Sequence, residues 1–307
     1  MKKVIVLLTA FLMVIALCGC AAPAADSGEQ SEAEAYYQRL VSCKEQIESI
    51  VGDFKPEVVI VLGSGLGEYA NELDAVATIP YTEIEGWPET TVHNHAGNLV
   101  FARYKGLNVV VMQGRVHYYE GYSMDEVVLP IRVLHMLGAD TCILTNAVGA
   151  INADYHVGDF VCVKDHISSF VPSPLIGENI EELGERFVGM TDVYDKDMRK
   201  TLRKIGRKEN IPVHTGIYLQ VTGPQYETPT EIKMYRKLGA DTVAMSLAVE
   251  AIAASHMGMR ICGINCVSNM AAGMEEEGFS HDSIGETMEQ SAQNFEVLIN
   301  GLLDTLQ

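Results

Sequence analysis

Short apolar runs alternate with amphipathic segments along the chain from about residue 31 onward. The apolar runs have the length of strands and cover residues 56–67, 98–104, 107–114, 141–149, 159–167, 217–223, 242–246 and 259–269. Between and around them, apolar residues recur at helical spacing over residues 34–54, 123–139, 196–209, 228–240, 247–258 and 281–307. This alternation predicts an α/β fold, with one domain at residues 32–307 and a largely parallel, twisted sheet flanked by helices.

The composition is that of a globular protein, with 48% hydrophobic and 21% charged residues. Acidic residues outnumber basic ones by 41 to 22, which gives a formal charge of −19. Nucleic acid and anionic lipid surfaces attract basic stripes, so this charge argues against such partners and predicts no nucleic-acid binding. A small anion remains a possible ligand wherever local donors converge.

The first 20 residues have the pattern of a secretory signal. Lys2 and Lys3 precede an apolar run that ends in the sequence "LCGC" at Cys20. This end resembles a bacterial lipobox, although Cys18 stands where a small residue is more usual. We therefore expect cleavage before Cys20, lipidation of Cys20 and a flexible tether over residues 21–31. The alternative is an uncleaved N-terminal anchor helix, and both readings tie the protein to a membrane.

Five cysteines remain in the predicted domain: Cys43, Cys142, Cys162, Cys262 and Cys266. Four of them lie in apolar strand-like runs, and no Cys/His spacing typical of a zinc site occurs. Buried free thiols are the favoured interpretation.

Polar residues crowd the end of one predicted strand in the stretch "VVVMQGRVHYYEGY", residues 109–122. Arg115, His117, Tyr118, Tyr119 and Glu120 follow the four-residue apolar run closely. Ligands of parallel α/β sheets bind outside the carboxyl ends of strands, so this end is a candidate anion site.

A second strand end carries the loop "LGSGLG", with Ser64 between two glycines. Glycines allow backbone N–H groups to approach an anion, and the hydroxyl adds a donor. The loop matches neither a Walker A motif, nor a nucleophile elbow, nor G-x-G-x-x-G, and a structural turn is an equally good interpretation. His93 and His95, ahead of another strand, could be metal ligands, but no third ligand is nearby and solvent-facing loop histidines are the simpler reading.

The remaining strand ends carry further polar or accessible groups. Small residues follow Asn146, so the backbone at Ala147 is accessible; Ser246 lies ahead of a predicted helix, whose N–H groups favour anions. Thr228 and Glu231 have the spacing of a capping box, which leaves the neighbouring Glu227 without a structural explanation. The last groups of this kind are Tyr226, Asn269 and His281.

Two kinds of binding chemistry emerge from these strand ends. Ser64, Arg115, Ser246 and the backbone of Ala147 together suit an oxyanion. Glu227 accepts hydrogen bonds and Asn269 both donates and accepts, which suits the edge of a heterocyclic base. Tyr119 and Tyr226 offer flat surfaces for a sugar or a base. Each residue alone is more often structural, but their shared position at strand ends favours a common site.

The chain resembles purine nucleoside phosphorylases of the trimeric, low-molecular-mass class from about residue 40 to 305. The motifs are "LGSGLG", "HAGNLVF", "MQGRVHYYEGY", "TNAVGA", "GPQYETPTE" and "VSNMAAGM…SH", in the family's order. The resemblance implies phosphorolysis of purine nucleosides to free base and (deoxy)ribose 1-phosphate. It also implies a homotrimer, phosphate as co-substrate, and neither a metal nor an organic cofactor.

The resemblance assigns roles position by position. Phosphate ligands would be Ser64, Arg115, His117, the Ala147 backbone and Ser246, with His95 close to the anion. Tyr119, Met245 and His281 would surround the ribose. Tyr226 would stack near the base, and Glu227 and Asn269 would bind its edge; His95, Glu227 and Asn269 are the implied catalytic residues. Phe170 is the candidate for an aromatic residue that the family contributes to the neighbouring subunit.

Asn269 implies a preference for inosine and guanosine over adenosine, because relatives that cleave methylthioadenosine carry Asp here. The chain departs from the family pattern at Leu247, where Thr is usual, at Val249, where Pro is usual, and at Val148 in "NAVGA". These apolar changes bear on affinity and substrate range more than on the reaction type.

Two other functions remain open from the sequence. A nucleoside hydrolase would use water in place of phosphate and would not need the anion site. A membrane-anchored nucleoside-binding lipoprotein would hold its ligand without turnover. The N-terminus predicts a lipoprotein on the extracytoplasmic face of the membrane, whereas purine salvage chemistry is more usual in the cytoplasm, which is the alternative location.

Overall fold

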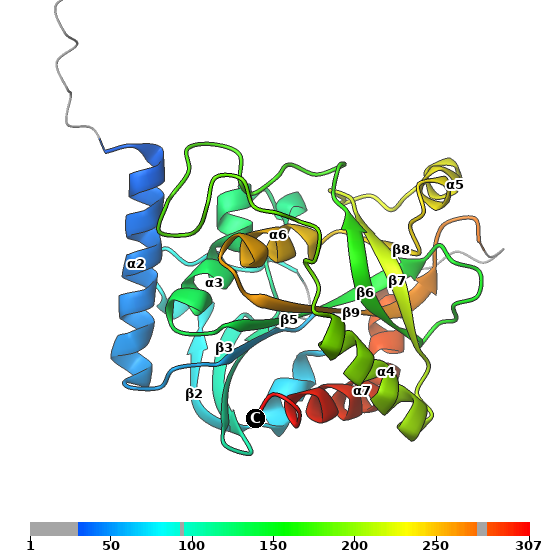
Figure 1. Cartoon of the computed structure of the whole chain (residues 1–307), viewed down its shortest axis with the longest axis horizontal. Helices are drawn as coiled ribbons and strands as arrows, with labels where there is room; N and C mark the ends of the chain where they lie inside the picture. The colour runs from blue at the N-terminus through cyan, green and yellow to red at the C-terminus, as the bar shows by residue number, and fades with distance from the viewer. Residues whose placement is uncertain (1–29, 93–94, 275–280) are drawn as a thin grey trace, which may run out of the picture.

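The computed structural model describes residues 30–92, 95–274 and 281–307, with side chains in the last segment from residue 287. Nine strands form one sheet in the order β2-β3-β4-β1-β5-β8-β7-β6-β9 (Figure 1). The strands are β1 (Val58–Val61), β2 (Asp74–Pro80), β3 (Asn98–Tyr104), β4 (Leu107–Gln113), β5 (Thr141–Ala150), β6 (Phe160–Ile167), β7 (Val213–Gln220), β8 (Thr242–Ala244) and β9 (Arg260–Met270).

The predicted α/β class is confirmed, and the sheet is mixed. Parallel pairs join β1 to β4 and β5, β5 to β9, and β7 to β6 and β8. Antiparallel pairs are β2–β3, β3–β4, β5–β8 and β6–β9. Because β9 pairs with both β6 and β5, the strands β5, β8, β7, β6 and β9 form a closed ring of pairings.

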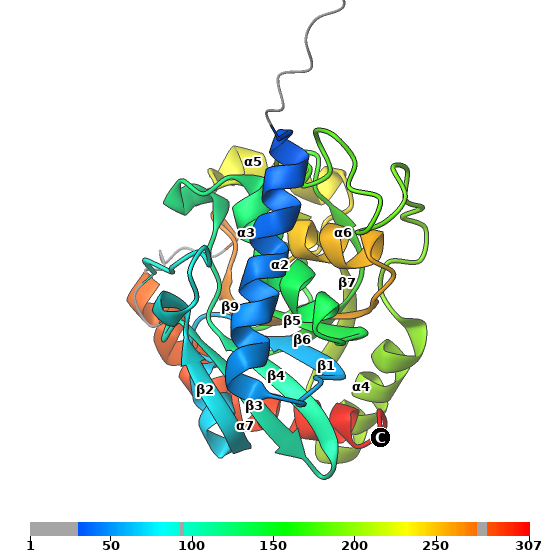
Figure 2. The same ribbon diagram turned by 90° about the vertical axis from the view of Figure 1, so that its left-hand side faces the viewer.

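Helices cover both faces of the sheet, as Figures 1 and 2 show. On one face lie α2 (Glu32–Val51), α3 (Met124–Met136) and α6 (Ala248–His256), and on the other α4 (Lys196–Glu209) and α7 (His281–Leu303). The short helix α5 (Pro229–Lys237) follows β7. Two large apolar clusters fill the space between helices and sheet, one around Leu40, Leu129 and Ala251 and the other around Leu202 and Phe295.

Capping residues mark the starts of three helices, one of them predicted from the sequence. Ser31 caps α2, which ends at Gly52, and the Ser123–Glu126 pair forms a capping box at α3. Thr228 and Glu231 form the predicted capping box of α5. None of the helices in the described part of the chain is long and apolar enough to cross a bilayer.

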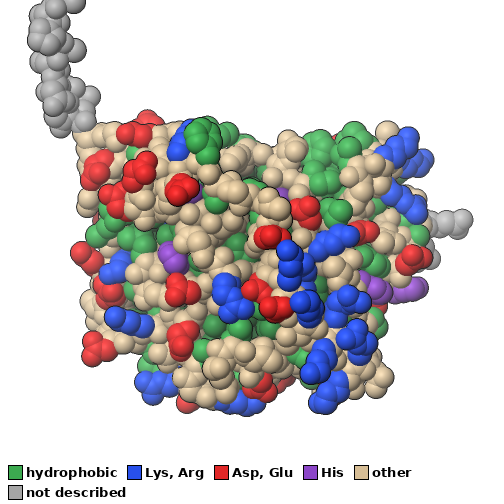
Figure 3. All heavy atoms as spheres, viewed as in Figure 1, with side chains coloured by type: hydrophobic (Ala, Val, Ile, Leu, Met, Phe, Trp, Pro, Cys, Tyr) green, Lys and Arg blue, Asp and Glu red, His purple; other side chains and the backbone are tan. Residues whose placement is uncertain are grey.

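Charge is distributed unevenly over the surface. Lys and Arg side chains gather over α4 in Figure 3, whereas the chain as a whole carries a surplus of acids. The five cysteines of the described domain are buried and free, as predicted. No group of three or more potential metal ligands occurs among the described residues.

Candidate active site

A cavity of about 540 Å³ lies where the predicted strand-end segments converge. Its walls come from the segment before β3, from the loops after β1, β4, β7 and β8, and from the final residues of β5, β8 and β9. Arg115, Ser64 and Ser246 line it together with Glu227 and Asn269, so the residues predicted to bind an anion and those predicted to bind a base share one cavity. The other predicted residues that line it are His95, His117, Tyr119, Ala147, Tyr226 and Met245.

The strand ends approach closely because small residues separate them. A Cβ at Gly63 would lie 3.2 Å from Cα of Asn146, so a side chain there would push the β1 loop away from β5. The Gly63 N–H donates to the Thr145 hydroxyl over 2.9 Å, and that hydroxyl donates to the Val61 carbonyl over 2.8 Å. This arrangement holds the Ser64 loop against the end of β5.

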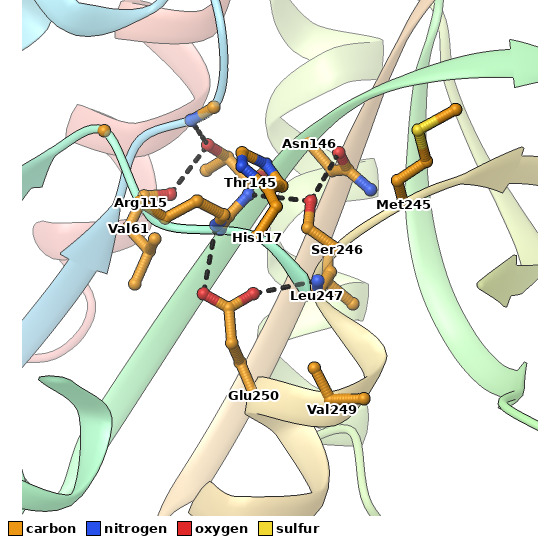
Figure 4. Close-up of polar contacts among 12 residues, drawn as sticks. Val61, Arg115, His117, Thr145, Asn146, Met245, Ser246, Leu247, Val249 and Glu250 are labelled. Carbon is orange, nitrogen blue, oxygen red and sulfur yellow. Dashed lines mark hydrogen bonds and ion pairs between the residues drawn. The ribbon is translucent and has the colours of Figure 1, made fainter. Parts of the chain in front are cut away.

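Arg115 provides the buried cation of the cavity and is only 2% exposed. Its Nε donates to Glu250 Oε1 over 3.0 Å, and its Nη1 donates to the Thr145 carbonyl over 2.6 Å and to Ser246 Oγ over 3.3 Å (Figure 4). Its Nη2 is buried and has no hydrogen-bond partner among the described residues. A buried guanidinium cation that lines a cavity favours an anion as its ligand.

His95 lies beside the Ser64 loop and the backbone of Arg115. Its Nε2 lies 3.2 Å from Ser64 Oγ, and its Nδ1 lies 3.0 Å from the Arg115 carbonyl oxygen. Burial, and then the neighbouring His117, lower the pKa of His95 to about 4. The ring is therefore neutral near pH 7 and can donate or accept a single proton at Nε2.

His117 is fixed by an acid that the sequence reasoning left without a role. Glu120 Oε1 lies 2.9 Å from His117 Nδ1, and Glu120 Oε2 accepts from the backbone and hydroxyl of Thr91 at 2.7 and 2.6 Å. Burial opposes ionisation of Glu120, but these hydrogen bonds prevail and lower its pKa to about 2. The Tyr119 ring stacks on His117 with centroids 4.7 Å apart.

The far end of the cavity presents an acid and an amide. Asn269, at the end of β9, is 9% exposed, and burial raises the pKa of Glu227. Ser268 Oγ donates to Asn269 Oδ1 over 2.8 Å, and Asn269 Nδ2 donates to the Met270 carbonyl over 3.0 Å. One hydrogen of the amide nitrogen stays available, so this end can both donate to and accept from a planar heterocycle.

Some predicted residues lie elsewhere. Phe170 does not line this cavity; the residue is 39% exposed, and its ring contacts that of Tyr235. The side chain of His281, and the residues His93 and Cys20, lie outside the described part of the chain. Two of the residues that differ from the family pattern lie in different surroundings. Val148 lines the cavity, whereas the side chain of Leu247 is buried in the core.

Four residues with contacts at the site were not predicted from the sequence: Thr91, Glu120, Ser268 and Glu250. Glu120 follows His117 by three residues, and Glu250 follows Leu247, the neighbour of Ser246, by three. At this spacing each carboxylate accepts from the backbone N–H of the earlier residue. This three-residue spacing is the sequence pattern from which Glu120 and Glu250 could have been predicted. Ser268 precedes Asn269 directly, and nothing in the local pattern distinguishes it.

Comparison with known proteins agrees with this fold and site. The family model described as "Phosphorylase superfamily" matches residues 57–304. Purine nucleoside phosphorylase 1 of Bacillus subtilis is 43% identical over 81% of this chain and 92% of its own length. Purine nucleoside phosphorylase of Bos taurus is 39% identical over 82% of this chain and 90% of its own.

Solved structures give the same result. Schistosoma mansoni purine nucleoside phosphorylase in complex with inosine superposes with a TM-score of 0.84 at 34% identity, covering 91% of this chain and 99% of its own. A schistosoma purine nucleoside phosphorylase with hypoxanthine has a TM-score of 0.83 at 36% identity, over 88% and 98% of the two chains. The fold and site thus define a member of the phosphorylase superfamily, and the chain belongs, within it, to the purine nucleoside phosphorylases.

Proposed function

We propose that this protein cleaves purine nucleosides with inorganic phosphate, preferring inosine and guanosine, and releases the free base and (deoxy)ribose 1-phosphate. The observation that carries the proposal is the single cavity in which Arg115 and two serines lie together with Glu227 and Asn269. Family membership supports the reaction type, and relatives with bound inosine and hypoxanthine support the substrate class.

The arrangement suits a dissociative displacement at C1′ of the sugar. As the glycosidic bond breaks, positive charge develops on the ribose and negative charge on the base. A phosphate held by Arg115, Ser64 and Ser246 would stabilise the ribosyl cation and then bond to C1′ with inversion. The purine would leave with the electron pair and take up a proton. Phosphate is thus the co-substrate, and the donors for it come from the chain itself, so we propose that no cofactor is required.

The base preference rests on Asn269. Because the Met270 carbonyl can only accept, the amide atom beside it is Nδ2, and the second hydrogen of this nitrogen suits the carbonyl O6 and the N7 of a 6-oxopurine. The donor would stabilise the departing purine as charge accumulates, an effect of about 2–4 kcal/mol for preorganised donors. Glu227 would accept from N–H groups on the same edge.

One assay tests the reaction type. The protein is incubated with inosine, with and without phosphate, and hypoxanthine and ribose 1-phosphate are measured. Phosphate-dependent release of both products is expected. Phosphate-independent release of hypoxanthine would identify a nucleoside hydrolase, and binding of inosine without release would identify a nucleoside receptor. Either result would overturn the proposal.

We also propose a homotrimer in which Phe170 contributes to the site of the adjacent subunit. The exposure of Phe170 and its position outside its own cavity support this role. Sedimentation of the parent and of a Phe170→Ala variant tests it. The parent should sediment as a trimer, and steady-state kinetics should show a higher KM for the nucleoside in the variant. A monomeric parent would contradict the proposal.

Finally, we propose lipidation at Cys20 and a location on the extracytoplasmic face of the membrane. The basic and apolar N-terminus ending in "LCGC" supports both. Cells labelled with a radioactive fatty acid should incorporate label into the parent and not into a Cys20→Ala variant. Label retained by the variant, or a parent found in the cytoplasm without label, would contradict this assignment.

A further inference from the structure

The cation and one hydroxyl of the proposed anion site, Arg115 and Ser246, come from separate parts of the chain. Arg115 follows β4, and Ser246 follows β8. The carboxylate of Glu250, in the first turn of α6, lies between them: Oε1 accepts from Arg115 Nε over 3.0 Å, and Oε2 accepts from the Leu247 N–H over 2.8 Å (Figure 4). The ion-paired side chains of Arg115 and Glu250 are 2% and 3% exposed, so water does not compete for these contacts.

The chain makes a strained turn directly after Ser246. Leu247 has φ 82° and ψ −51°, and the Ala248 N–H donates to the Ser246 carbonyl over 3.2 Å. This is a γ-turn of the rare type that costs energy for a residue with a Cβ. The hydroxyl of Tyr218 also donates to the Ser246 carbonyl. Glu250 and Tyr218 thus hold the turn from its two sides, and the turn fixes where Ser246 Oγ lies.

The same carboxylate fixes the orientation of the Arg115 guanidinium. With Nε bound to Glu250 and Nη1 bound to Thr145 and Ser246, Nη2 is the guanidinium nitrogen left without a partner among the described residues. A guanidinium fixed at two of its three nitrogens has little freedom to rotate. The guanidinium is therefore preorganised beside the cavity that Arg115 lines.

We infer that Glu250 is a positioning residue that assembles the phosphate subsite by joining Arg115 to the turn that carries Ser246. The inference rests on the proposed phosphorolysis. Both groups that Glu250 contacts are donors, and a carboxylate offers two acceptors. A glutamine of the same shape offers one acceptor and one donor, so it can satisfy Arg115 or Leu247 but not both.

The test compares Glu250→Gln with the parent in steady-state assays that vary phosphate and inosine separately. Loss of a fixed charged hydrogen bond predicts a rise of about tenfold or more in the KM for phosphate, with the KM for inosine within about twofold of the parent. Phosphate binding measured by calorimetry should weaken by a similar factor. A role in folding alone would lower the unfolding temperature without separating the two KM values.

Two further variants complete the experiment. Glu250→Asp keeps the charge but is one methylene shorter, so it cannot reach both partners, and its KM for phosphate should also rise. Asp159→Asn is the matched control: Asp159 is a buried acid, 6% exposed, that contacts His214 outside the cavity, and its loss should leave the KM for phosphate unchanged.

The outcomes separate the inference from the proposed function. A parent that releases no hypoxanthine in response to phosphate would reject the phosphorolysis. A phosphate-dependent parent with a phosphate KM within about twofold in Glu250→Gln and Glu250→Asp would reject the positioning role alone. A higher KM for phosphate in both Glu250 variants, with an unchanged KM in Asp159→Asn, would support the positioning role.

Discussion

The hydroxyl of Ser268 donates a 2.8 Å hydrogen bond to the side-chain oxygen of Asn269. The Met270 carbonyl lies 3.0 Å from Asn269 Nδ2 and can only accept, so it orients the amide with its nitrogen toward Met270 and its oxygen toward Ser268. The amide oxygen is engaged by a neighbour, and the amide nitrogen retains a free proton. Asn269 can therefore offer a hydrogen-bond donor to a ligand, which is the basis of the first prediction.

Replacement of Asn269 by Asp should shift the substrate preference toward adenosine. An ionised Asp cannot donate to O6 or N7, but it can accept from a 6-amino group. Loss of one preorganised donor predicts a fall of about 100-fold or more in kcat/KM for inosine, with a smaller fall for adenosine. Parallel kinetics on the two nucleosides measure the ratio. The KM for phosphate serves as the internal control, and an unchanged inosine/adenosine ratio would contradict the assignment of Asn269.

Replacement of Arg115 by Ala should impair phosphate use and also destabilise the fold. The missing charged donor predicts a rise of about 100-fold in the KM for phosphate. The variant also leaves the Glu250 carboxylate buried without its cation, a loss of about 3–5 kcal/mol in the free energy of unfolding. Enzyme kinetics and urea unfolding measure the two effects.

Arg132→Ala is the control for the Arg115 variant. Arg132 is likewise buried, at 4% exposure, but lies outside the active-site cavity. Its removal should destabilise the protein without changing the KM for phosphate. Wild-type-like phosphate kinetics in Arg115→Ala would refute the role of this residue in the anion site.

His95 should make the protein less stable as the pH falls from about 6.5 to about 4. Its pKa is lowered in the folded state from the ordinary 6.5 to about 4, by burial first and by His117 second. In this window the unfolded chain binds a proton that the folded chain does not, so unfolding is favoured as the pH decreases. A His95→Asn variant cannot titrate at this position.

Urea unfolding at pH 7 and pH 5 measures this effect. The free energy of unfolding should fall less between the two pH values in His95→Asn than in the parent. The carboxylate of Glu120, whose pKa is lowered to about 2, contributes stability that is lost only below about 4.5, so it does not obscure the comparison. Equal losses in parent and variant would contradict a neutral, buried His95.

The sequence pattern predicted most of the strands and helices because their apolar periodicity is strong. The exception is β2, where most side chains are exposed and the strand lies at the sheet edge. An edge strand buries little, so its sequence carries no apolar run. The mixed pairing and the closed ring were not predictable either, because the β5–β9 contact joins segments more than 100 positions apart in the chain.

The site residues likewise divide into those that a local pattern predicts and those that depend on contacts between distant segments. Ser64, Arg115 and Asn269 follow apolar runs directly, so the rule that ligands bind at strand ends was sufficient to bring them together. Glu250 binds Arg115 from 135 positions away, and the pair forms only when the fold brings the first turn of α6 beside the segment after β4. Local spacing reveals a capping carboxylate, but it cannot reveal the distant cation that the carboxylate also binds.

Gly149 should control the position of the Asn269 amide. The two residues are paired in the β5–β9 ladder, beside a register shift, and a Cβ at Gly149 would lie 3.3 Å from Asn269 Nδ2. Gly149→Ala should therefore displace the amide by a fraction of an ångström. Misplaced catalytic groups are costly, so we expect kcat/KM for inosine to fall about tenfold while the KM for phosphate stays unchanged. Gly189→Ala is the matched control, because a Cβ there meets nothing within 4 Å. Unchanged inosine kinetics in Gly149→Ala, or an equal change in the KM for phosphate, would show that this contact does not position the base-binding amide.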